Sequence, residues 1–79
     1  MMIELFIYEA LINRKRVGNL YTDERRAREN LVRYMKYDGS LHLPTEEVNA
    51  WIPDILSGRF YEYKMACGVV WAIRRYEVE

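Results

Sequence analysis

The stretch RFYEYKMACGVVWAIRRYEV, residues 59–78, predicts two β-strands joined by a tight turn. Its two halves are rich in aromatic and β-branched residues, which favour extended structure. Cys67 and Gly68 separate the halves, and a residue followed by glycine between two apolar runs is a turn signal. We therefore expect an antiparallel hairpin with strands over residues 59–66 and 69–78.

A two-residue turn would fix the register of this hairpin and, with it, the direction of every side chain. It places Lys64 opposite Trp71. The face that carries Tyr63 and Val70 has a single charge, so we predict that it lies beneath the helices. The other face mixes large apolar with charged side chains, which is typical of a surface that a partner covers. This predicted partner-binding face consists of Phe60, Lys64, Trp71, Ile73 and Arg75, with Phe6 and Tyr8 from the first strand.

The N-terminal residues predict a second hairpin. Residues 2–12 are β-branched, aromatic and too apolar for a surface helix, and residues 16–21 form a shorter strand after a polar break. Gly18 is a candidate β-bulge. If the aliphatic set of the first strand faces the core, Phe6 and Tyr8 point to the open face. A small domain that simply leaves aromatic side chains half exposed would show the same pattern without a partner.

Between the hairpins the sequence predicts two helices. Thr22 is followed by two acidic residues, a typical helix start, because acids in the first turn complement the helix dipole. Ala27, Leu31 and Met35 recur at helical spacing and form one buried stripe. Gly39 ends this helix, because glycine readily adopts the left-handed conformation of a helix C-terminus.

The second helix begins at Thr45 as its N-cap and ends at Ser57, before Gly58. Pro53 lies inside it and predicts a kink or a break, because proline lacks the amide hydrogen of an interior position. The resulting order of elements is ββααββ. We expect one α+β domain over residues 1–79, an antiparallel sheet of about four strands with two helices packed on one face.

The composition restricts the setting in which the protein works. Twelve basic and twelve acidic residues balance, so no overall charge draws the chain to nucleic acid or to a membrane. One cysteine, Cys67, excludes an internal disulfide. The apolar N-terminus has no basic leader and acidic residues interrupt it, so we predict neither a signal peptide nor a membrane span. We expect a soluble, cytoplasmic protein without a membrane partner.

The sequence offers no constellation of residues for catalysis or metal binding. His42 is the single histidine, and one cysteine cannot complete a Cys/His cluster. A nucleophile and base made of Cys67 and His42 is the remaining alternative, but Cys67 falls at a hairpin tip where nothing would orient it. We predict a protein that is not an enzyme and that uses no cofactor and no metal.

Basic side chains between residues 14 and 36 form a second candidate surface. Guanidinium groups suit phosphate oxygens, so this surface predicts nucleic-acid binding as an alternative function. A solvated helix face with a Glu29–Arg33 ion pair would explain the same residues. The basic surface consists of Arg14, Lys15 and Arg16 in the first turn, and of Arg25, Arg26, Arg28, Arg33 and Lys36 on the first helix.

The leading prediction is a small interaction protein that docks a protein partner, or a second copy of itself, through the open sheet face. Charge is sorted along the chain: residues 14–36 hold eight basic and three acidic side chains. That asymmetry suits oriented docking. Small size, sorted charge and no catalytic residues would suit an accessory protein of a virus or mobile element that inhibits a host complex. Nucleic-acid binding remains the alternative.

Overall fold

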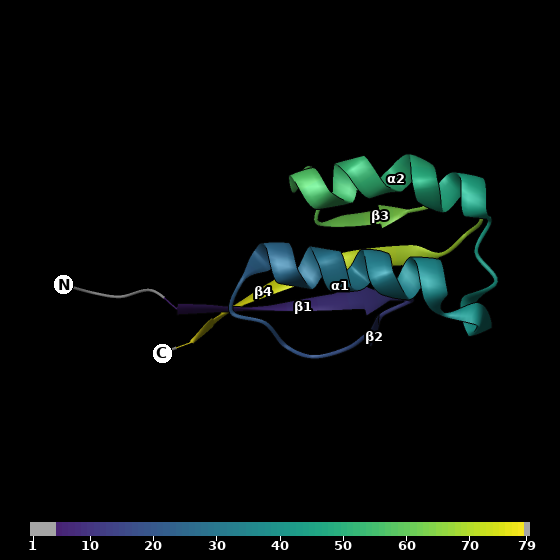
Figure 1. Ribbon diagram of the computed structural model, residues 1–79. Coiled ribbons are helices and arrows are strands. Elements are labelled where there is room, and N and C mark those ends of the chain that lie inside the picture. Colours follow the sequence, from purple (N-terminus) through teal and green to yellow (C-terminus); the bar gives the residue numbers. More distant parts are fainter. Residues whose placement is uncertain (1–4, 79) are drawn as a thin grey trace.

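The chain folds as the predicted α+β domain, with its elements in ββααββ order (Figure 1). The computed structural model describes residues 5–78. Four strands form one antiparallel sheet in the order β2-β1-β4-β3, and both helices lie on the same face of it. The elements are β1 (Leu5–Ile12), β2 (Lys15–Arg16), α1 (Glu24–Tyr37), the 3-10 turn η1 (Gly39–Leu41), α2 (Thr45–Ser57), β3 (Glu62–Lys64) and β4 (Val70–Val78). Part of the predicted first strand, residues 2–4, lies outside the described residues.

The β1–β2 hairpin closes on a two-residue turn. Asn13 and Arg14 have φ of 51° and 68°, the pair of positive values that a type I′ turn requires. Asparagine tolerates this conformation, and the Asn13 side chain also accepts a hydrogen bond from the Val70 amide at 3.0 Å. The turn sets Ile12 opposite Lys15.

The second predicted strand is shorter than expected. β2 covers only two residues, and the chain returns to β1 at a single bridge between Tyr21 and Tyr8. Gly18 interrupts the strand with φ 75°, and a Cβ at this position would lie 2.3 Å from Nδ2 of Asn30. The same Nδ2 donates to the Val17 carbonyl oxygen at 2.7 Å, so this loop is fastened to α1.

α1 forms where the sequence predicts a helix, but its two capping residues differ from the prediction. Asp23, rather than Thr22, is the N-cap, and its carboxylate accepts from the Arg25 amide at 2.9 Å. After α1 the chain enters η1 directly. Gly39 opens η1 without a left-handed φ, so its predicted capping role is wrong; Asp38 ends α1 in an extended conformation instead.

α2 is one continuous helix. Its N-cap is Pro44, and the predicted capping by Thr45 is wrong because Thr45 is already the first helical residue. The predicted break at Pro53 does not occur, since α2 runs on to Ser57. Gly58 ends the helix as predicted, with φ 82° and its amide hydrogen-bonded to carbonyl oxygens of the last turn.

The β3–β4 hairpin turns on three residues instead of the predicted two. The Met65 amide donates to the Val69 carbonyl oxygen at 2.8 Å, which leaves residues 66–68 as the loop. Gly68 takes φ 96°, as the last residue of such a loop commonly does. The extra loop residue shifts the whole register by one position.

This shift exchanges the two faces of β4. Trp71 lies opposite Tyr63 instead of Lys64, and its side chain is fully buried beneath the helices. Tyr63 keeps its predicted side, because its ring contacts Trp51 of α2 at 4.2 Å between centroids. The residues of β4 that point away from the helices are Val70, Ala72, Arg74 and Tyr76, which the two-residue turn had placed beneath them.

β1 follows β4. Its register sets Ala10 opposite Ile73 and Ile12 opposite Trp71, so its even-numbered residues face the helices. Phe6 and Tyr8 therefore lie on the helix side, opposite to their prediction. The core between sheet and helices includes Ala10, Ile12, Ala27, Leu31, Met35, Val48, Ile55, Met65, Trp71 and Ile73.

Candidate binding surfaces

The helix-free face of the sheet carries a ladder of cross-strand pairs from β1 and β4. The register places Leu5 beside Val78, Ile7 beside Tyr76, Glu9 beside Arg74, and Leu11 beside Ala72. Leu11 and Ala72 are buried although they lie outside the helix-covered core cluster, so neighbouring side chains close the centre of this face.

Glu9 organises the centre of the helix-free face. Its residue exposure is only 7%, and both carboxylate oxygens are bonded: Arg16 Nε donates at 2.8 Å and the Tyr76 hydroxyl at 2.8 Å. The hydrogen bond from Arg16 is the main cause that lowers the pKa of Glu9 below its ordinary value. The Tyr76 hydroxyl and the positive charges of Arg16 and Arg74 lower it further, and together they outweigh burial, which acts in the opposite direction. The carboxylate is therefore charged and paired at neutral pH.

The far end of the ladder is apolar and exposed. Leu5, Tyr76 and Val78 are 48%, 46% and 42% exposed, and Ile7 between them is half-buried. In Figure 1 these ends of β1 and β4 extend as a two-stranded ribbon past the first turn of α1. We call Leu5, Ile7, Tyr76 and Val78 the ribbon patch. The alternation of β1 is visible in the sequence, but its aliphatic set, which includes Leu5 and Ile7, was expected to face the core.

The same ribbon has an unpaired edge. In β4 the odd-numbered residues direct their backbone groups away from β1, as the Ile73 amide does when it donates to the Tyr61 carbonyl oxygen at 2.7 Å. Beyond that bond, the amide and carbonyl groups of Arg75 and Glu77 point to the same edge. No backbone partner meets them within residues 5–78.

The structure does not bring the predicted partner-binding residues together on one face. Trp71 and Ile73 are core residues, so their predicted place on an open surface is wrong. Phe6 and Tyr8 lie on the helix side, and Arg75 holds its guanidinium 4.5 Å from the centroid of the Phe6 ring on that side. Of the seven predicted side chains, Lys64 alone belongs to a helix-free position, opposite Val70.

Phe60 joins an aromatic cluster at the α2 side of the sheet. Its ring lies edge-on to Trp51 at 5.7 Å between centroids and 5.6 Å from Tyr63. Trp51 also meets Trp71 edge-on at 5.9 Å. The Nε1 of Trp71 is buried with no hydrogen-bond acceptor in the described part of the chain. This cluster covers the core at one edge, and Phe60 and Tyr63 form its outer rim.

The predicted basic surface is divided by ion pairs. Arg16 is bound to Glu9 on the helix-free face, and Arg25 pairs with Glu29 at 3.2 Å in place of the expected Glu29–Arg33 pair. Lys36 lies 5.9 Å from the centroid of the Tyr37 ring. Four further cations, Arg14, Lys15, Arg26 and Arg33, are exposed and make no ion pair within residues 5–78.

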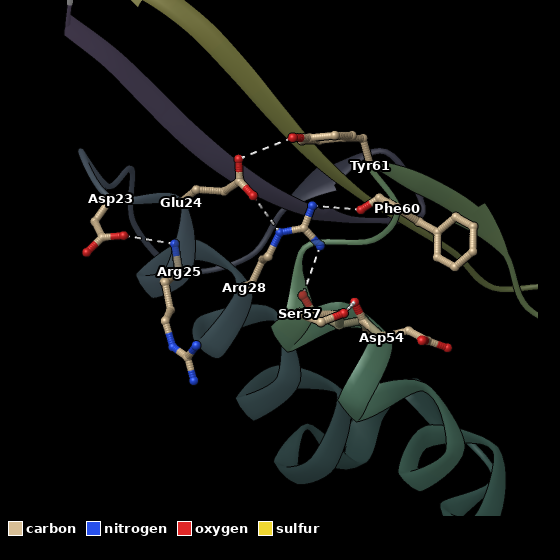
Figure 2. Close-up of polar contacts among 9 residues, drawn as sticks. Asp23, Glu24, Arg25, Arg28, Asp54, Ser57, Phe60 and Tyr61 are labelled. Carbon is tan, nitrogen blue, oxygen red and sulfur yellow. Dashed lines mark hydrogen bonds and ion pairs between the residues drawn. The ribbon is translucent and has the colours of Figure 1, made fainter.

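Arg28 does not belong to that surface, because it is buried to 1% exposure between the helices and β3 (Figure 2). Its Nη1 donates to the Ile55 carbonyl oxygen at 2.9 Å and its Nη2 to that of Phe60 at 2.7 Å. Its Nε donates to Glu24 at 3.0 Å. The guanidinium thus joins α1, the end of α2 and the approach to β3, and its role is structural.

Beside α1 lies an open groove of about 620 Å³, between the helix and the loop that follows β2. A smaller hollow adjoins it and adds Arg26 and Glu29. Tyrosine rings line the groove with one arginine and one acid, so its charge is balanced. The lining residues are Gly18, Asn19, Tyr21, Asn30, Arg33, Tyr34, Tyr37 and Asp38.

The remaining candidates for chemistry lie apart from these surfaces. Cys67 is exposed in the β3–β4 loop, as predicted, and its amide donates to a Glu47 carboxylate oxygen at 3.3 Å. His42 is exposed at the end of η1 with φ 50°. No group of three or more potential metal ligands occurs in the described region, and no helix there is long and apolar enough to cross a membrane.

Comparison with known proteins gives no match to a family, to a curated protein or to a solved structure.

Proposed function

We propose that the protein is a non-enzymatic binding module that docks another polypeptide on the ribbon formed by the ends of β1 and β4. One observation carries this proposal: three large apolar side chains, Leu5, Tyr76 and Val78, are exposed as neighbours on a face that neither helix covers. Covering each of these half-exposed side chains would stabilise a complex by roughly 1 kcal/mol.

The chemistry around the ribbon patch suits a protein partner better than a small ligand. The patch lies on the face of a two-stranded ribbon, whereas the grooves lie elsewhere. Glu9 next to it already has both carboxylate oxygens bonded, so a partner can cover it without leaving an unpaired charge. The backbone groups of Arg75 and Glu77 add hydrogen-bonding sites that an extended strand would match.

A photo-crosslinking residue at position 76 tests this proposal in cells that contain the natural partners. Position 37 is the matched control, because Tyr37 is an exposed tyrosine that lines the groove along α1 and does not belong to the ribbon patch. We expect position 76 to capture a defined protein that position 37 does not. Once purified, the captured protein should bind the Val78→Asp variant at least about tenfold more weakly than wild type. It should bind the Arg33→Glu variant as tightly as wild type. Equal capture at both positions, or binding indifferent to Val78→Asp, would overturn the proposal.

A second candidate function is binding of single-stranded nucleic acid in the groove beside α1. The observation that favours it is the combination of Tyr21, Tyr34 and Tyr37 with Arg33, since rings stack bases and guanidinium groups bind phosphates. Asp38 opposes it, because this acid lines the same groove and offsets the charge of Arg33. The ribbon patch has no such opposing charge and therefore ranks first.

Fluorescence anisotropy of a labelled oligonucleotide across a salt series tests the second candidate. If the groove binds phosphates, Arg33→Ala should weaken binding and flatten the dependence on salt by about 0.7 per lost contact. Arg14→Ala is the matched control, because Arg14 does not line the groove. Absence of binding at low salt would remove this candidate. The cytoplasmic location and the role as a viral or mobile-element inhibitor of a host complex stay predictions.

A further inference from the structure

We propose that the partner of the ribbon is a second copy of this chain, joined antiparallel along the free edge of β4 with Tyr76 at the two-fold axis. This inference rests on the proposed function, because it names the occupant of the same ribbon. It starts from the backbone of Arg75 and Glu77, whose amide and carbonyl groups point to an edge that β3 no longer covers. An unpaired edge of this kind is a template for another strand.

The direction of the backbone groups limits how two such edges can pair. In an antiparallel pair, two residues with outward backbone groups lie opposite each other and exchange hydrogen bonds. Symmetric pairing of residues 74–78 can therefore be centred on position 75, 76 or 77. A two-fold axis makes each contact occur twice, so the charges at these positions decide between the registers.

The charges favour the register centred on Tyr76. There, Arg75 of each copy lies opposite Glu77 of the other, and both pairs exchange backbone hydrogen bonds. Centring on Arg75 would oppose two arginines, and centring on Glu77 would oppose two glutamates; like charges directly opposite destabilise a sheet. Neither Arg75 nor Glu77 has an ion pair of its own within residues 5–78.

The same register also joins the apolar surfaces. Tyr76 meets Tyr76 of the second copy as a non-hydrogen-bonded pair, whose side chains approach most closely. On the helix-free face Tyr76 pairs with Ile7 and is followed by Val78, so the two ribbon patches become one surface across the axis. The hydrogen bond from Ile73 to Tyr61, the residue before β3, is the last contact of this edge with the β3 segment. The free edge begins after Ile73, so pairing over residues 74–78 does not displace β3.

Charge exchange at the edge tests this arrangement. We expect the wild-type chain to form dimers in sedimentation equilibrium. Arg75→Glu and Glu77→Arg should each raise the dimer dissociation constant by about tenfold or more, because each change creates two like-charge pairs. The double variant should restore it. Lys36→Glu, on α1, is the matched charge control and should change nothing.

Mixing the two single variants distinguishes a lost charge pair from a folding defect. One copy then carries two acids at positions 75 and 77 and the other carries two bases, so both cross-strand pairs are attractive again. We expect a heterodimer at concentrations where each variant alone is monomeric, whereas a folding defect in either variant would not be repaired by mixing. A monomeric wild type, or single variants that dimerise as tightly as wild type, would overturn the second copy as partner. Capture of a different protein at position 76 would still support docking at the ribbon.

Discussion

The two faces of the sheet have the same alternating strands but are held in different ways. On the covered face, Trp71 and Ile73 of β4 are buried by the helices. On the helix-free face, Glu9 is buried and hydrogen-bonded to Arg16 and Tyr76, whereas the ribbon patch is largely exposed. We therefore expect the covered face to contribute more to stability than the exposed ribbon patch of the helix-free face. Paired substitutions on the two faces test this difference in stability.

Shortening one aromatic residue on each face should give unequal losses. Trp71→Ala removes the largest fully buried side chain and should lower the free energy of unfolding by about 4 kcal/mol. Tyr76→Ala removes a ring that is half exposed and should cost below about 1.5 kcal/mol, mainly through its hydrogen bond to Glu9. Urea unfolding followed by circular dichroism measures both. Equal losses would mean that the ribbon patch is part of the folding core.

Two arginines allow the same comparison for polar contacts. Arg28→Ala removes a buried guanidinium that satisfies two carbonyl groups and Glu24, and should cost about 3 kcal/mol. Arg16→Ala removes a half-exposed partner of Glu9 and should cost about 1 kcal/mol. Arg28→Lys should recover little, because an ammonium group cannot reach both carbonyl groups in the geometry of a guanidinium. A larger loss for Arg16→Ala would contradict this difference in stability.

Two glycines with positive φ separate local strain from packing. Gly18→Ala combines a strained φ of 75° with a clash against Asn30 on α1, and should cost about 2 kcal/mol. Gly68→Ala has φ 96° but open space around the new methyl group, and should cost about 1 kcal/mol. Thermal unfolding of the two variants measures the difference. Equal losses would show that the contact between the Gly18 loop and α1 is loose.

The sequence predicted the elements and their order, because these depend on local patterns. The stripe of Ala27, Leu31 and Met35, and Gly58 after α2, each carry their signal within a few residues. The faces of the sheet depend on one count, the length of the loop before Val69. A turn at Cys67 and Gly68 fits two or three residues equally well in sequence, and the choice reverses every side chain of β4.

The binding surfaces were predictable only in part for the same reason. A helix-free face was expected, but on β1 and β4 it carries the other alternate set of side chains than the predicted one. The basic surface was recognised by composition, yet the ion pairs of Arg16 and Arg25 join residues seven and four positions apart, and only the helical spacing of the second is visible in sequence. The burial of Arg28 could not be predicted from the sequence, because its carbonyl partners belong to residues far along the chain.

Acid should lower the free energy of unfolding through Glu9 on the helix-free face. Its pKa is lowered in the folded protein, chiefly by the hydrogen bond from Arg16, so the charged form is favoured by folding. The stabilisation is complete above the ordinary pKa of 4.5 and is lost as the pH falls through the lowered value. Glu9→Gln removes this dependence. The difference in unfolding free energy between wild type and Glu9→Gln should therefore shrink between pH 6 and about pH 3. All other carboxylates are common to both proteins and cancel, so a difference that stays constant over this range would mean that the Arg16 and Tyr76 contacts do not hold the carboxylate in its charged form.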